Sequence, residues 1–383
     1  MKRGYIYAVL ITAAMDGACK KPYSPVIKSG GVRYLVVEGV INPGSDSTII
    51  TLSRTVKLSS KSASDPELHA QVTVESDQSA EYPLLEIGGG KYASPGLNLD
   101  NSREYRLKIK TADGKEYASD LVPVKITPPI DSVGYKVLRD SLEIYANAHD
   151  PTGNTKYYRW DYDETWRFHA LYDSQFISNG HVLEYRTADQ EIFFCFKSDT
   201  SADIVLGTSN KLSQDVIYQN PIVLIRGTSE KVELEYSILV RQYALTKDAY
   251  DYWQNIKKNT EQIGSIFDAQ PSEATGNIHC TSNPSVPVLG YISVCTVPSK
   301  RIFITKQDLP DSWQPIYPYT CGTDTLKGQG RIQDNLITLP PQFITVGPVG
   351  DYFNPTGWVG TDRECADCTI RGDLKPPAFW IYK

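Results

Sequence analysis

The sequence predicts a mainly β protein built from two parts and one long helix. Short runs of alternating apolar and polar residues, separated by turn-forming residues, recur along most of the chain. One stretch instead repeats its apolar residues at helical spacing. We therefore expect an immunoglobulin-like β-sandwich over residues 32–126 and a larger β-sandwich-like domain over 133–383. The second domain should carry one docked α-helix, at about 247–263, and a disulfide-stapled, loop-rich tail.

The first residues have the composition of an export signal. Lys2 and Arg3 form a basic start, and an apolar run follows over residues 5–15. This run is too short to span a bilayer and suits the core of a signal peptide. We expect a lipoprotein signal peptide over residues 1–18.

Cys19 is the predicted site of lipidation. The two small residues before it resemble a bacterial lipobox, although Asp16 stands where such a site normally carries an apolar residue. The alternative is a free or structural cysteine near the N-terminus. If Cys19 is acylated, it anchors the chain in the bilayer, and residues 19–31, rich in Pro, Gly, Ser and Lys, form a tether.

The first sandwich is predicted from alternation with a period of two. Residues 32–126 contain several such runs and no helical pattern. A proline-rich segment, residues 126–132, marks the predicted boundary.

The second domain begins with an aromatic strand pattern. In the run YYRWDYDETW, Tyr158, Trp160 and Tyr162 fall on one face, whereas Asp161 and Asp163 fall on the other. These aspartates and Glu164 are candidates for a calcium site or for acid and base catalysis. We favour a solvated strand face, because further oxygen ligands at regular spacing do not follow them.

The helix prediction depends on one stripe and two end signals. Thr246 is a suitable N-cap, and Gly264 supplies a stop. Apolar residues recur at helical spacing: Ala249, Tyr252, Trp253, Ile256 and Ile263.

The cysteines predict disulfide bonds, since an even number of them follows Cys19 in an exported chain. Cys280 and Cys295 flank a proposed strand connection, so we expect them to pair first. The other four are expected to form one or two bridges among themselves, with connectivity left open: Cys195, Cys321, Cys365 and Cys368. The motif Cys365-Ala-Asp-Cys368 also allows a zinc site or a redox pair. A zinc site would need more ligands, and a redox pair would need a following helix, which Pro376 and Pro377 oppose.

The sequence carries no motif of a known catalytic class. HExxH, GxSxG and a phosphate-binding glycine loop are all missing from it. The net charge of −6 gives no electrostatic reason to bind nucleic acid. We expect no metal, no cofactor and no enzyme activity. A hydrolase stays an alternative, because glycosidase carboxylate pairs leave no local motif.

Trp313 and Trp358 lie in the loop-rich tail and are candidate contacts for a ligand or partner. Such residues stack on sugars or grip a protein. The alternative is that they plug loops onto the sandwich.

Several long motifs together resemble one known family. They are YLVVEGVI after the lipobox cysteine, YYRWDYDETW, the helical stretch from Leu245, VLGYISV, and CADCTIRGDLKPPAFW. This set is similar to a Bacteroidota lipoprotein family known as domain of unknown function 4249. Genes of that family commonly sit beside TonB-dependent transporters. The resemblance implies no catalytic residues.

From these observations we expect a surface-facing lipoprotein of the outer membrane. It would act as a non-catalytic accessory or binding subunit of a TonB-dependent transporter, by capturing a nutrient or covering the transporter mouth. The glycan or peptide ligand is unknown. Two alternatives are a surface hydrolase of glycan or peptide and a structural envelope protein.

Overall fold

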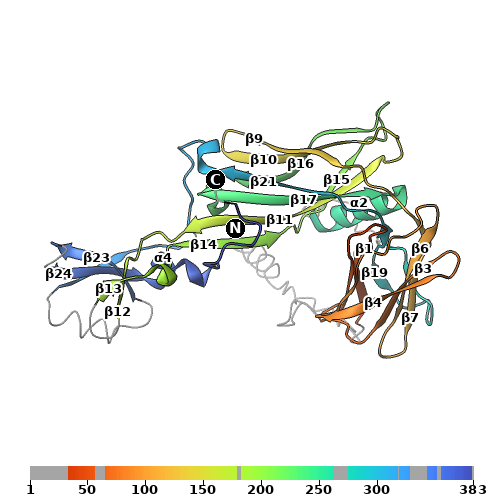
Figure 1. Ribbon diagram of the computed structural model, residues 1–383, viewed down its shortest axis with the longest axis horizontal. Coiled ribbons are helices and arrows are strands. Elements are labelled where there is room, and N and C mark those ends of the chain that lie inside the picture. The colour runs from red at the N-terminus through yellow and green to blue at the C-terminus, as the bar shows by residue number, and fades with distance from the viewer. Residues whose placement is uncertain are drawn as a thin grey trace, which may run out of the picture.

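The computed structural model describes residues 33–56, 65–178, 183–261, 275–317, 319–327, 343–351 and 355–381. The mainly β prediction is confirmed: strands dominate, and one long helix is present within these ranges. The predicted signal peptide, Cys19, the predicted tether and Gly264 lie outside the described residues. Figure 1 shows three β bodies placed along the long axis, with the helix between two of them.

The first body is a strongly curved sheet of eleven strands. Eight come from the N-terminal region: β1 (Leu35–Ile41), β2 (Thr48–Arg54), β3 (Gln71–Ser76), β4 (Glu81–Gly88), β5 (Lys91–Ser94), β6 (Glu104–Lys110), β7 (Glu116–Ser119) and β8 (Val122–Pro123). Three come from much later in the chain: β18 (Ile278–Cys280), β19 (Val288–Gly290) and β20 (Ser293–Val294). The inward residues of these strands form one core, in which Leu35, Ile50 and Tyr105 are fully buried.

The late strands correct the predicted domain boundary, which placed residues 278–294 in the second domain. β19 pairs in parallel with β1, and Leu35 lies opposite Val288. β18 pairs antiparallel with β7, and Cys280 lies opposite Tyr117. Periodicity identifies these segments as strands, but it does not say which strand each one will pair with. The second domain is therefore interrupted by a return of the chain to the first.

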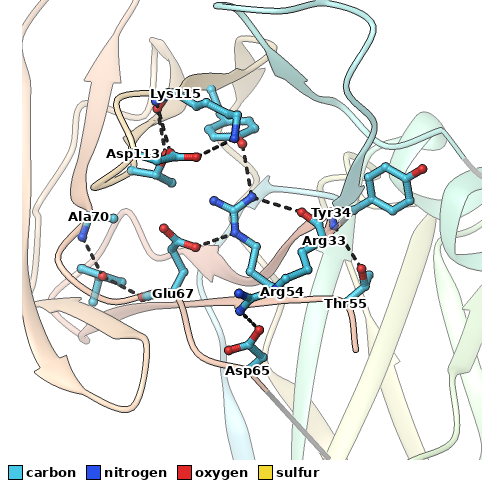
Figure 2. Close-up of polar contacts among 12 residues, drawn as sticks. Arg33, Tyr34, Arg54, Thr55, Asp65, Glu67, Ala70, Asp113 and Lys115 are labelled. Carbon is cyan, nitrogen blue, oxygen red and sulfur yellow. Dashed lines mark hydrogen bonds and ion pairs between the residues drawn. The ribbon is translucent and has the colours of Figure 1, made fainter. Parts of the chain in front are cut away.

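A polar network lies beside the start of β1 and the end of β2 (Figure 2). The guanidinium of Arg54 donates to a carboxylate oxygen of Glu67 and to the carbonyl oxygen of Arg33. Arg33 in turn forms an ion pair with Asp65. The Arg54 and Glu67 side chains are only 9% and 13% exposed, so their charges compensate each other away from bulk water.

The central body is a sandwich of two sheets. One contains β9 (Ile130–Val137), β10 (Ser141–His149) and β16 (Val216–Arg226). The other contains β11 (Tyr157–His169), β14 (Phe194–Thr200), β15 (Val205–Thr208), β17 (Glu235–Leu245) and β21 (Ser299–Thr305). The predicted alternation along β11 is confirmed, because Tyr158, Trp160 and Tyr162 are buried in the core between the sheets. The indole of Trp160 donates to the buried amide oxygen of Gln242 at 2.9 Å, so its polar atom is satisfied.

The third body is a small β projection at the far end of the molecule from the first sandwich (Figure 1). Its strands are β12 (Phe176–Ser178), β13 (Leu183–Tyr185), β22 (Thr323–Lys327), β23 (Phe343–Gly350) and β24 (Pro355–Asp362). A one-turn helix, α4 (Arg363–Ala366), follows it. Four 3-10 turns lie at Ala188–Gln190, Glu230–Val232, Lys306–Asp308 and Cys368–Ile370.

The long helix is α2 (Lys247–Glu261), and it starts directly after β17. Thr246 caps it as predicted: its hydroxyl oxygen accepts from the Ala249 amide at 3.2 Å. Tyr250 packs on Tyr157 of the central body, whereas Tyr252 packs on Tyr291 beside the first sandwich. The helix thus contacts both bodies. No helix in the described ranges has the length and apolar character needed to cross a bilayer.

The disulfides partly match the prediction. Cys195 bonds Cys368, and Cys321 bonds Cys365, so the four cysteines expected to bridge among themselves do so. The two cysteines of the Cys365-Ala-Asp-Cys368 motif therefore have different partners, which is incompatible with a redox pair or a zinc site formed by this motif. The first bond ties Cys368 to β14 of the central body, and the second ties α4 to the residues just before β22.

The predicted bond between Cys280 and Cys295 is wrong: both are buried free thiols. Cys280 faces the core of the first sandwich, whereas Cys295 lies in a separate cluster with Tyr243, Leu245 and Ala249. Proximity in sequence suggested a bridge, but the two side chains belong to different cores.

Cysteine labelling tests this pattern. In the Cys19→Ala chain, we expect iodoacetamide to modify no cysteine in the native protein, because burial raises the pKa of the Cys295 thiol to about 12 and Cys280 is 2% exposed. Denaturant without reductant should expose two reactive thiols, and reductant should raise the number to six. Intact mass spectrometry reads these numbers. Complete resistance in denaturant would instead indicate a bond between Cys280 and Cys295.

Candidate functional site

A cleft of about 950 Å³ lies between the first sandwich, the central body and α2. One wall is the outer face of β1 and β2, and the second is the outer face of β11 and β17. Helix α2 supplies the third wall, and Figure 1 shows it in the angle between the two bodies. The volume falls within the range of small-molecule sites, and the position between two domains is typical of them.

Strand alternation decides which side chains face this cleft. On β1, Leu35 and Val37 are buried in the sandwich, so Val36 and Glu38 project from the opposite face. On β11, the buried aromatic residues alternate with Arg159 and Asp161, which line the cleft. The pattern that builds the two cores therefore also builds the two facing walls.

Arg159 packs against two aromatic rings. Tyr243 is directly opposite it on β17, and the Arg159 Cζ lies 4.4 Å from the centre of the Tyr243 ring. The same Cζ lies 4.5 Å from the centre of the Trp253 ring, on α2. These distances are typical of cation–π contacts. Two different elements thus place aromatic rings against one guanidinium.

Arg241 is arranged differently, because acidic partners neutralise it. Its Nε donates to Asp161 Oδ1 at 2.5 Å, and its Nη1 and Nη2 both donate to Asp163. The hydrogen bonds to Asp163, together with the charge of Asp161, raise the pKa of Arg241. In return, the hydrogen bond from Arg241 lowers the pKa of the Asp163 carboxyl. The bidentate geometry makes this a strong pair.

The remaining cleft surface is mostly aromatic and apolar. Tyr252 and Tyr291 pack together with ring centres 5.2 Å apart, and Trp253 meets Tyr252 edge to face. Gly290 permits the close approach of β19 to β1: its φ is +133°, and a Cβ there would lie 2.1 Å from the Val37 carbonyl oxygen. The sandwich wall carries the exposed carboxylates of Glu38 and Asp46.

The two tryptophans proposed as contacts do not line this cleft. Trp313 is 7% exposed and packs in the central core against Gly227, so its predicted role in contacting a ligand is wrong. Trp358 is half-buried on β24 and meets the ring of Phe176 at 5.2 Å. Loop composition suggested exposure, whereas the long-range fold buries the first of these rings.

The three acidic residues of β11 do not converge on one site. Asp161 and Asp163 are held by Arg241 on the outer face. Glu164 is 3% exposed, and the Tyr236 hydroxyl and the Lys231 ammonium both donate to it. The prediction of a solvated face is therefore wrong for Glu164, which compensates Lys231 inside the protein. Within the described ranges, no group of three His, Cys, Asp or Glu side chains is arranged to hold a metal ion.

Local patterns in the sequence predict parts of the cleft walls but not the cleft. The helical stripe includes Trp253, and strand alternation puts Asp161 on the outer face of its strand. The pairing of Arg159 with these rings had no local signal, because the rings come from two other elements.

Comparison with known families identifies the chain. The family model described as Domain of unknown function (DUF4249) matches residues 20–301. The chain belongs to the DUF4249 family. The matched region contains every residue that lines the cleft, from Val36 to Ser299.

Other comparisons add no function. No curated protein matches the chain. Among solved structures, a mutant of Salmonella alpha-2-macroglobulin is similar over 84% of this chain, at 10% identity and a TM-score of 0.18. The similar region spans 16% of that much longer chain. So low a score supports no argument about fold.

The ion pairs of Arg241 predict that the stability lost in an Arg241→Gln variant depends on pH. The folded-state pKa of Asp163 lies below its unfolded value, so the pair stabilises the fold above the ordinary aspartate pKa of about 3.9. This stability is lost as the pH falls through the folded-state pKa. Arg241→Gln should therefore be less stable than the natural protein at pH 7, by a margin that shrinks below about pH 4.

Urea unfolding at pH 7 and at pH 3 measures this difference. Arg139→Gln is a matched control, since it removes the same charge from an exposed turn between β9 and β10. It should leave stability nearly unchanged at both pH values. An Arg241→Gln deficit of equal size at pH 3 and pH 7 would contradict the assignment to Asp163.

Proposed function

We propose that this DUF4249 protein is a lipid-anchored, non-catalytic binding subunit that serves a TonB-dependent transporter of the outer membrane. The cleft between its first two bodies would hold the nutrient before transfer. The observation that carries the proposal is the composition of this cleft, in which a clamped arginine and four aromatic rings face a space of about 950 Å³. Few, well-placed polar groups on an aromatic surface are typical of ligand-binding sites.

The anchor supports the same proposal. Acylation of Cys19 would tie the chain to the bilayer, and a tether over residues 19–31 would let the first sandwich stand off the surface. The first described strand, β1, begins at Leu35 and forms one wall of the cleft. A short tether therefore leads directly into the body that carries the binding wall.

A surface hydrolase is the second candidate, and one cluster favours it. The Nε2 of His169 lies 3.1 Å from Glu233 Oε1, and the Tyr317 hydroxyl donates to the same carboxylate. Burial raises the pKa of Glu233, as is common for a general acid. However, Glu233 is 6% exposed, and neither it nor His169 lines the cleft. The cluster is better explained as a buried network that joins β11, the residues just before β17 and the segment near Tyr317.

A pull-down from the native outer membrane tests the transporter role. We expect the tagged protein, extracted in mild detergent, to recover one TonB-dependent transporter in comparable amount, as measured by quantitative mass spectrometry. The Cys19→Ala variant is the control, and it should leave the membrane fraction and lose the transporter. Recovery of the membrane-bound protein without any transporter would contradict the accessory role.

A further inference from the structure

We propose that Arg159 is the anchor of a carboxylate-binding subsite in the cleft, and that the ligand is a small organic monoanion with an aromatic or apolar portion. The inference rests on the proposed function in one respect, since it takes the cleft to be a binding site. It adds the chemical class of the ligand and the residue that recognises it.

The first observation is the unmet hydrogen-bonding capacity of Arg159. A guanidinium offers five N–H donors. Among the described residues, the acidic group within ion-pair range of Arg159 is Asp161, whose Oδ2 lies 3.6 Å from Nη2, beyond hydrogen-bond length. The Nε atom is buried and has no acceptor. Since the side chain is only 17% exposed, water compensates this charge poorly.

The second observation is the direction left open to a partner. The N–H groups of a guanidinium lie in its plane, and the rings of Tyr243 and Trp253 both pack within 4.5 Å of the Arg159 Cζ. A partner must therefore approach the edge of the group. A carboxylate does this well, because its two oxygens match the planar fork of the guanidinium.

The third observation is that Asp161 is already engaged. Arg241 Nε donates to Asp161 Oδ1, and the rest of the Arg241 guanidinium is held by Asp163. Asp161 therefore shares its charge between two arginines, and it cannot fully neutralise Arg159. Among the described residues, Arg241 therefore has two aspartate partners, whereas Arg159 has a share of only one and can take a further acceptor.

The opposite wall limits the charge of the ligand. Glu38 and Asp46 line the cleft from the sandwich side, and both are exposed. A second negative group on the ligand would meet these carboxylates and be repelled. The surface between the two walls is formed by Tyr252, Tyr291 and Ile256, which suit an apolar or aromatic portion. One carboxylate on an otherwise uncharged organic group fits all three walls.

A matched pair of compounds tests the charge. N-benzoylglycine carries one carboxylate beside an aromatic amide, and N-benzoylglycinamide has nearly the same shape without the charge. Isothermal titration calorimetry is performed with each compound on the full-length protein in nonionic detergent. We expect the carboxylate to bind at least about tenfold more tightly than the amide, as charge-assisted hydrogen bonds do.

Three variants separate recognition from packing. Arg159→Gln should abolish the preference for the carboxylate, and Arg159→Lys should keep part of it, because lysine retains the charge but not the fork. Arg139→Gln removes the same charge outside the cleft and should bind like the natural protein. Thermal melts of each variant verify folding. Loss of the preference in Arg159→Gln, with the melt cooperative, supports the subsite.

Two results would overturn the inference. Equal binding of the two compounds to the natural protein would show that charge is not recognised. A carboxylate preference that survives Arg159→Gln would show that Arg159 only clamps α2 to β17. Either result leaves the transporter role standing if the pull-down recovers a transporter, so failure of the subsite is distinguishable from failure of the proposed function.

Discussion

The return of the chain into the first sandwich is the constraint on which the structure depends. After α2, the segment 278–294 pairs with β1 and β7, and the chain then re-enters the central body as β21. The chain therefore crosses between the two bodies more than once. A single crossing would leave a flexible linker, whereas repeated crossings and a shared helix restrict the relative position of the bodies. The cleft depends on this restriction, because its walls belong to different bodies.

Helix α2 completes the site by supplying the third wall of the cleft. Its start is held by the Thr246 cap. Near its end, the Lys257 ammonium donates to the Ile204 carbonyl oxygen, and a Glu261 carboxylate oxygen accepts from the Ile204 amide. Between these points Trp253 projects onto Arg159. A side chain so fixed loses little further freedom when a ligand binds, which is the physical basis of preorganisation.

The cysteines show two different ways of stabilising one chain. The bond from Cys195 to Cys368 joins the central body to the C-terminal segment, and the bond from Cys321 to Cys365 joins two parts of that segment. Each bond limits the conformations that the unfolded chain can adopt. Cys280 and Cys295 instead pack as small apolar side chains inside well-formed cores. The even number of cysteines predicted that all six would pair, but Cys280 and Cys295 are buried, like most of the bonded cysteines, and stay free because they lie in different cores.

The sequence by itself determined the β class, the alternation on β11, the Thr246 cap, the extent of α2 to within a few residues, and the family resemblance. Each of these depends on neighbours in the chain. Only the tertiary structure decided that residues 278–294 complete the first sandwich, that Trp313 is buried, that Glu164 compensates Lys231, and that Arg159 packs against both Tyr243 and Trp253. These features join segments up to about 250 residues apart, and no local pattern specifies which distant strand or ring a given side chain will meet.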